Sequence, residues 1–426
     1  MSTLKYWVWL SAMTGLKPRK RFELLNTFGD PEKVYFADER LLRDSLNFSD
    51  SERALVMNKS LERATEILEK CHEHNITVIS YQDVSYPQRL KNIYDPPVTL
   101  FVKGRLPTMD EQAAIGVVGT RKATPYGIKM ARKMGYELTK SGGLVVTGLA
   151  EGIDSAAAEG ALRAGGACVG VLGCAIDDIF PKWNDVLYGD VSLAGALVSE
   201  YPPGDTINKK NFPERNRIIS GLSLGVTVIE APFRSGALIT ASLALEQGRE
   251  VFAIPGNADA PNCFGSNELI RDGAQLVTSG WDVLADFVQQ FPDKLAKLDP
   301  QKTVGFYQEE QEKVSVYEAH RKEETRTIAT ETGKGFAKLR VKTDRKRIDN
   351  HKKREYIDLQ EQLSGLSERQ LKIVSVMDEK SKHIDDIIGL TGLSAPEVLS
   401  ELTILQIKGF VSQENGKRFT LNIAKR

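Results

Sequence analysis

The chain has 426 residues, a length typical of about two to four domains. Lys and Arg number 57 and so do Asp and Glu, which excludes a globally basic coat protein and an acidic disordered chain. No apolar stretch approaches the roughly 18 residues of a membrane helix, and the N-terminus lacks the order of a secretory signal. The four cysteines form no CxxC pair, so we expect a reduced cytoplasmic protein.

Residues 1–70 predict a helical domain. Gly15 and Gly29 separate short segments, and Asp30-Pro31 is typical of an N-cap followed by proline at the first helical position. Apolar residues recur at helical spacing through the last segment, which predicts one long helix there. The expected helices are Lys5–Met13, Arg19–Phe28, Pro31–Ala37 and Ser51–Glu73.

Residues 76–290 predict a doubly wound α/β domain. Short runs rich in Val and Ile alternate with helical segments such as Pro125–Lys140 and Ala237–Gln247. The runs are apolar throughout, as expected of strands buried on both faces of a parallel sheet. They are Ile115–Val118, Leu144–Val146, Cys168–Leu172, Ala196–Ser199, Val226–Ile229, Val251–Ile254 and Leu276–Val277. Two earlier runs, Thr77–Ser80 and Val98–Val102, are expected to extend the sheet.

Residues 291–356 predict a charged linker, because the hydrophobic pattern is lost from residue 300 and Lys334–Arg354 carries ten Lys and Arg against two Asp and Glu. A solvated linker and a tether that touches nucleic acid are the open alternatives. Residues 357–426 predict a winged helix, with helices at Glu368–Asp378, Ile384–Gly389 and Ala395–Lys408 and a two-stranded wing from Phe410 to Leu421. The third helix carries one basic residue, Lys408, which favours a protein partner over duplex recognition.

The loop after strand Ile115–Val118 predicts an anion site. Gly119 permits a tight turn, and Thr124 and Pro125 suit the start of a helix whose free N–H groups would face a phosphate. Arg121 adds a bidentate guanidinium. Tight packing of the turn without a ligand is the alternative interpretation.

The loop after the second strand argues against a nicotinamide cofactor. A dehydrogenase has an acidic residue at the end of this strand, where this chain has Thr147 and Gly148. Asp154, further along the loop, is expected to cap a helix or to orient a basic residue.

The basic segment Lys209–Ser220 carries the strongest indication of function. Lysines, Phe212 and two arginines suit phosphodiester oxygens and a stacked base. The alternative is an ion pair, which we expect to bury at least one of Arg215 and Arg217 against a carboxylate. The five histidines all lie outside the parallel strands and their loops, and there is no nucleophile elbow, metal-ligand cluster or Walker lysine. These features favour a binding protein with no metal and no cofactor over an enzyme.

The segments GVVGTRKATPYG, TGLAEGIDSAA, NFPERNRIISGLS and SGALITASLALEQGREVFAIPG occur in the order and spacing of the DNA-processing protein A (DprA/Smf) family, which this chain resembles. The resemblance implies an extended Rossmann-like domain flanked by helices like those of sterile-alpha-motif domains and by a winged helix. It also implies a homodimer that binds single-stranded DNA, protects incoming DNA and loads the RecA recombinase during natural transformation, on DNA that carries single-strand-binding protein.

The resemblance also assigns the DNA-binding residues. They are Gly119, Arg121, Tyr126, Gly127, Gly148, Gly152, Lys209, Phe212, Arg215, Asn216, Arg217, Ser235, Gly236 and Asn267. Glu151 and Ala158 depart from the basic residue and the histidine that the family usually has there. The competing hypothesis is a nucleotide-processing enzyme, which would need a pair of carboxylates from Asp154, Glu200 and Glu230.

Overall fold

The structure is a computed structural model, which describes residues 3–13, 15–45, 47–298, 368–377, 382–391, 393–395, 397–398, 401–402, 405, 411–414 and 418–421. The chain divides into two compact units, Met1–Glu309 and Glu310–Arg426, which are considered separately. Within the described residues, no helix is both long enough and apolar enough to cross a bilayer. All four cysteines are buried free thiols.

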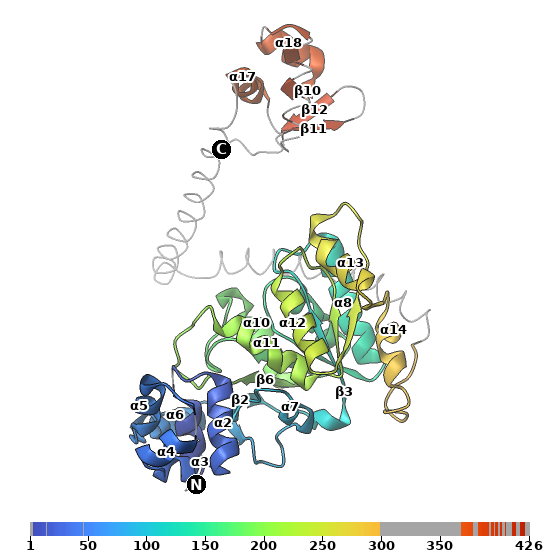
Figure 1. Ribbon diagram of the computed structural model, residues 1–426. Helices are drawn as coiled ribbons and strands as arrows, with labels where there is room; N and C mark the ends of the chain where they lie inside the picture. The colour runs from blue at the N-terminus through green and yellow to red at the C-terminus, as the bar shows by residue number, and fades with distance from the viewer. Residues whose placement is uncertain are drawn as a thin grey trace, which may run out of the picture. The chain divides into compact units, whose positions relative to one another are not determined.

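The N-terminal helices pack against the first two strands of the sheet. Their tryptophans and leucines, Trp7 and Leu24 among them, share one hydrophobic core with Phe101 in β2. Helix α1 contacts β2 and helix α6 contacts β1, and Figure 1 shows the N-terminal helices gathered at the end of the first unit where β2 lies. The elements are α1 (Leu4–Ser11), α2 (Pro18–Phe28), α3 (Pro31–Phe36), α4 (Glu39–Ser45), α5 (Asp50–Met57), α6 (Glu62–Glu73), β1 (Ile76–Ser80) and β2 (Thr99–Gly104).

The single long helix predicted from Ser51 to Glu73 is wrong, because the chain leaves the helix between α5 and α6. The Asn58 side chain accepts a hydrogen bond from the Ser60 N–H at 3.2 Å, and the Ser60 hydroxyl accepts one from the Glu62 N–H at 3.3 Å. Side chains that bond to nearby backbone compete with helical hydrogen bonds. Apolar residues keep the helical spacing on both sides of this break, so the sequence pattern did not indicate it.

Nine strands form one sheet in the order β1-β2-β6-β5-β4-β3-β7-β8-β9. Strands β3 to β9 run parallel, whereas β2 pairs antiparallel with both β1 and β6. The remaining strands are β3 (Ala113–Val118), β4 (Gly143–Thr147), β5 (Cys168–Leu172), β6 (Ala196–Ser199), β7 (Gly225–Val228), β8 (Glu250–Ala253) and β9 (Gln275–Leu276). The predicted doubly wound sheet is confirmed, and each strand overlaps one of the predicted apolar runs.

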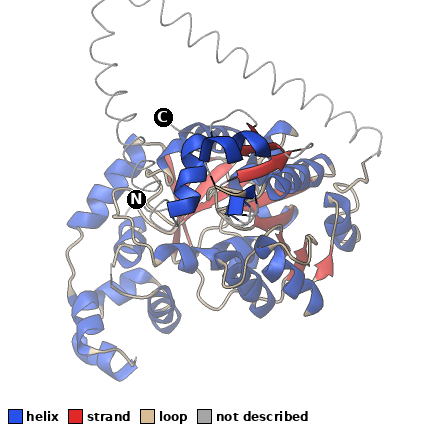
Figure 2. Ribbon diagram, turned by 90° about the horizontal axis from the view of Figure 1, so that it is seen from above, coloured by secondary structure: helices blue, strands red, loops and turns tan. Residues whose placement is uncertain are grey.

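Helices cover both faces of this sheet, as the red strands between blue helices in Figure 2 show. One core lies under α8 (Pro125–Lys140), α9 (Ile153–Arg163), α10 (Asp185–Ala194) and α14 (Gly280–Leu284). The other lies under α7 (Gln88–Lys91), α11 (Asn211–Leu222), α12 (Gly236–Glu246) and α13 (Phe264–Arg271). Short 3₁₀ turns occur at η1 (Met109–Glu111), η2 (Lys182–Asn184), η3 (Pro261–Cys263) and η4 (Ala285–Phe287). Because β3 lies between β4 and β7, the winding direction reverses there, and a crevice opens at the carboxyl ends of the strands.

The described part of the second unit has the first two helices and the wing that were predicted for a winged helix. Its elements are α17 (Glu368–Val376), β10 (Lys382–His383), α18 (Ile384–Thr391), β11 (Val411–Glu414) and β12 (Arg418–Leu421). Antiparallel β11 and β12 form the wing, and β10 adds an unpredicted third strand beside β12. Residues 299–356 of the predicted linker and most of the predicted third helix lie outside the described residues.

Candidate nucleic-acid interface

A cleft of about 610 Å³ opens at the point where the winding of the sheet reverses. Its walls are the loop after β3, the loop after β7, and the first turns of α11, which follow β6. The residues that line it are Val118, Gly119, Thr120, Arg121, Ala150, Asp154, Phe180, Lys209, Phe212, Pro213, Arg215, Asn216, Ile219, Pro232, Ser235, Gly236, Ala237 and Thr240. Eight of the residues predicted to bind DNA therefore come together here.

The mouth of the cleft carries positive charge that no carboxylate among the described residues neutralises by an ion pair. Arg121 and Lys209 line the cleft, and Lys122 and Lys210 are exposed next to them in the chain. The structure gives none of these four side chains an ion-pair partner within the residues it describes, whereas Arg43, which is also exposed, forms an ion pair with Glu39. Uncompensated cations in a cleft attract anions such as phosphates.

Phe212 supplies an aromatic surface beside these cations. Its ring centroid lies 5.1 Å from that of Phe180 and 5.4 Å from the Arg121 guanidinium. A Cβ atom on Gly173 would lie only 2.8 Å from the Phe212 ring, so this glycine allows the ring to pack against the backbone. An aromatic face beside a guanidinium is the arrangement on which unpaired bases stack.

Arg215 lines the cleft but is buried. Its Nη1 donates hydrogen bonds to the carbonyl of Gly148, at 2.9 Å, and to that of Val171. Burial lowers the pKa of Arg215, while the nearby Asp154 carboxylate raises it. Arg215 therefore ties the ends of β4 and β5 together beneath the cleft and places a charge below its floor.

Asp154 lies in the same floor and accepts a hydrogen bond from the Gly148 N–H at 3.1 Å. Burial raises the pKa of its carboxyl group to about 6, against the opposing effect of Arg215. Asp154 thus orients the loop after β4 and balances Arg215, the structural role that the sequence indicated.

This pKa predicts how stability depends on pH. An unfolded aspartate titrates near pH 4, so the folded state binds more protons between about pH 4 and pH 6. The contribution of Asp154 to the free energy of unfolding therefore falls as pH rises through this interval and is constant above it. Asp154→Asn should remove this part of the dependence of the unfolding free energy on pH. Urea unfolding of the wild type and of Asp154→Asn from pH 4 to pH 7.5 would measure it. Parallel curves for the two proteins would contradict the assignment.

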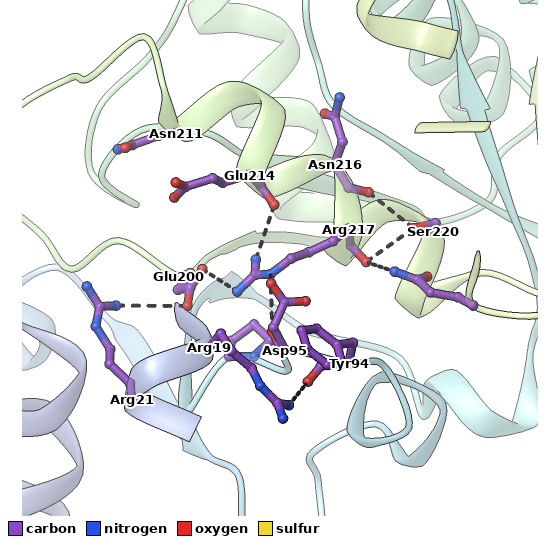
Figure 3. A network of polar contacts seen from close by, with 12 residues as sticks. Arg19, Arg21, Tyr94, Asp95, Glu200, Asn211, Glu214, Asn216, Arg217 and Ser220 are labelled. Atoms are coloured by element: carbon purple, nitrogen blue, oxygen red, sulfur yellow. Dashed lines mark hydrogen bonds and ion pairs between the residues drawn. The ribbon is translucent and has the colours of Figure 1, made fainter. Parts of the chain in front are cut away.

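Arg217 points away from the cleft. Figure 3 shows Asn216 and Arg217 leaving α11 in different directions. Only 4% of Arg217 is exposed, and its guanidinium lies 2.8 Å from Glu200 and 3.1 Å from Asp95. Burial alone would lower the pKa of Arg217, but Glu200 and Asp95 outweigh it and raise the pKa. The ion-pair alternative thus describes Arg217.

The N-terminus of α8, where a phosphate site was expected, is occupied by the chain itself. The carboxylate of Glu230 accepts hydrogen bonds from the N–H of Thr124 at 2.9 Å and from its hydroxyl at 2.5 Å. A Cβ atom on Gly127 would lie 2.2 Å from this carboxylate. Glu230 therefore satisfies the positive end of the helix, and the first turn of α8 is not open to phosphate.

Several other predicted residues shape loops without lining the cleft. The Tyr126 hydroxyl donates to the Pro255 carbonyl at 2.8 Å. The Asn267 amide exchanges two hydrogen bonds with the Gly256 backbone, at 3.0 and 3.1 Å. Gly152 has φ +88°, a conformation that favours glycine, and packs against the loop after β3.

Phe180 is a residue of the cleft that sequence reasoning missed. It follows β5 in a loop that matches no phosphate or nucleotide motif, so only its exposed aromatic ring marks it in the structure. Glu151 and Trp183 border a smaller hollow that shares Arg121, Phe180 and Phe212 with the cleft.

The three carboxylates of the enzymatic alternative do not converge. Glu200 bonds to Arg217, Glu230 bonds to Thr124, and only Asp154 lines the cleft. The part of the chain that the structure describes also holds no cluster of His, Cys, Asp and Glu that could bind a metal ion.

The cleft and the doubly wound sheet place the first unit among Rossmann-like α/β proteins, and comparison with known proteins identifies the family. Residues 59–288 match the family described as DNA recombination-mediator protein A, and residues 359–417 match the DprA winged helix domain. The chain belongs to the DNA recombination-mediator protein A family.

One similar protein extends over both units, and two further comparisons cover part of the chain. The chain is 32% identical to Protein Smf of Synechocystis sp., over 97% of this chain and 98% of that protein. It is 45% identical to DNA processing protein DprA of Streptococcus pneumoniae, over 49% of this chain and 73% of that protein. The X-ray structure of the Streptococcus pneumoniae protein superposes with a TM-score of 0.57 at 36% identity, covering 66% of this chain and 97% of that one.

Proposed function

We propose that the protein binds single-stranded DNA in the cleft and acts in DNA processing during natural transformation. The observation that carries the proposal is that Arg121 and Lys209, which have no ion-pair partner among the described residues, line the same cleft as the Phe212 ring, with the Arg121 guanidinium 5.4 Å from that ring. The cations suit phosphodiester oxygens, and the ring suits an unpaired base. Membership of a family of DNA recombination mediators supports the same function.

In its finer form, the proposal is that the protein protects incoming single strands and loads RecA recombinase on them in the cytoplasm, as a homodimer. Family membership supports this role. The deciding assay is whether the purified protein places RecA on DNA already coated by single-strand-binding protein. A nucleotide-processing enzyme is the weaker candidate, because Asp154, Glu200 and Glu230 are engaged in three separate contacts.

We expect the full chain to bind single-stranded DNA more tightly than duplex DNA, with little sequence preference. Bases in a duplex are paired and stacked, so they cannot stack on Phe212, whereas phosphate contacts carry no sequence information. Fluorescence anisotropy with a labelled strand and its duplex, at one salt concentration, measures the difference. A chain that ends at Glu309, the boundary of the first unit, should bind the single strand as the full chain does. Equal affinity for strand and duplex, or loss of binding on truncation, would contradict the assignment.

A further inference from the structure

A second exposed aromatic surface lies outside the cleft, on the loops that follow β7 and β8. Phe233 is 62% exposed, and its ring centroid lies 5.5 Å from that of Phe264 at the start of α13. Pro232 and Ser235, on either side of Phe233 and Arg234, both line the cleft. The aromatic pair is therefore continuous with the rim of the candidate interface.

Close backbone packing holds this pair in place. The Gly265 N–H donates to the Ala231 carbonyl at 2.7 Å. A Cβ atom on Gly265 would lie 2.7 Å from that oxygen and 3.0 Å from the Pro232 carbonyl, so only glycine permits the approach. The start of α13 is thereby fixed against the loop after β7, and the two rings form a rigid surface rather than two independent side chains.

Two cations belong to the loops that meet at this surface: Arg234, and Lys122 from the mouth of the cleft. Arg234 has φ +60°, a left-handed conformation that is unfavourable for a long side chain, at the tip of the turn that the Ser235 N–H closes on the Pro232 carbonyl. Asn262, beside Phe264, donates to the Lys122 carbonyl at 2.9 Å, which joins this surface to the loop after β3. Arg234 and Lys122 are exposed, and neither has an ion-pair partner in the described part of the chain.

We propose that Phe233, Phe264, Arg234 and Lys122 form a second nucleic-acid subsite, which binds the stretch of single strand that leaves the cleft on the β7 side. This inference rests on the proposed function. Rigid aromatic faces with unpaired cations suit stacked bases and phosphates, and the charge continues that of Arg121 and Lys209. The ligand is a single-stranded polynucleotide, because only a strand of several nucleotides can occupy the cleft and the aromatic pair at the same time.

Substitutions of the full chain test the subsite. Phe233→Ala and Phe264→Ala should each weaken binding of a long single strand about tenfold, the order of effect of losing one stacked base. Binding of an oligonucleotide too short to leave the cleft should not change. Phe36→Ala is the matched control, because Phe36 is 69% exposed on α3 and far along the chain from any cleft residue. Phe36→Ala should bind the long single strand and the short oligonucleotide with wild-type affinity.

Arg234→Asn separates binding from folding. Asn adopts the left-handed conformation more readily than Arg, so the melting temperature should not fall. The salt dependence of binding to the long strand should become shallower by about 0.7 in slope, as expected when one phosphate contact is lost. One result would overturn the subsite and leave the cleft intact: Arg121→Ala loses binding, while Phe233→Ala and Arg234→Asn keep the wild-type affinity and the wild-type salt dependence of binding. The aromatic pair would then be a protein-binding surface. Wild-type binding in Arg121→Ala would instead overturn the proposed function.

Discussion

Arg121→Ala and Lys209→Ala are expected to lose single-strand binding about tenfold or more while keeping the wild-type melting temperature. A charged hydrogen bond to phosphate contributes roughly 1.5–3 kcal/mol, and each lost contact should reduce the salt slope of binding by about 0.7. Both side chains are exposed and have no carboxylate partner among the described residues, so their removal leaves no buried charge behind. Anisotropy titrations across a salt series, beside thermal unfolding, measure both quantities.

Exposed cations outside the cleft provide the controls for this experiment. Arg43→Ala on α4 and Lys33→Ala on α3 each remove one positive charge that a neighbouring carboxylate partly neutralises. Both should bind single strands as the wild type does, so a general effect of net charge is separated from a local one. If Arg121→Ala and Lys209→Ala bound normally across the salt series, the cleft would not be the DNA site.

The architecture of the sheet could be predicted because its strands are buried on both faces. Runs such as Ile115–Val118 and Cys168–Leu172 are apolar at every position, which is typical of strands in a parallel sheet that helices cover on both faces. The break between α5 and α6 escaped prediction, since its signal is a pair of local hydrogen bonds from Asn58 and Ser60 rather than a change in hydrophobicity.

The cleft was predicted only in part, because spacing does not decide which way a side chain points. Arg215 and Arg217 are two positions apart on α11, and at about 100° per residue they project to nearly opposite sides of the helix. Only one of the two could face the cleft. Likewise, Thr124 and Pro125 correctly indicated the start of α8, but Glu230, which occupies that helix end, lies 106 positions further along the chain.

Arg217→Ala is expected to destabilise the protein rather than to remove a DNA contact. The guanidinium bonds to Glu200, to Asp95 and to the Glu214 carbonyl, and Arg21 from α2 approaches the same Glu200 carboxylate at 3.9 Å, as Figure 3 shows. Removing one partner of a buried ion pair leaves the other group charged, buried and without a partner. This lowers the free energy of unfolding by roughly 3–5 kcal/mol. The melting temperature should fall by roughly 5–10 °C.

The network joins the N-terminal helices to the helix that carries the cleft residues. Arg21 belongs to α2, Glu200 follows β6, and Arg217 belongs to α11, so losing Arg217 should loosen the contact of α2 with the sheet. Arg43→Ala, which breaks an exposed pair, should change stability by less than about 1 kcal/mol. Well below its melting temperature, Arg217→Ala should still bind single strands within a few-fold of the wild type, because the guanidinium does not reach the cleft. A variant with wild-type stability and lost binding would instead place Arg217 in the interface, as the family resemblance first implied.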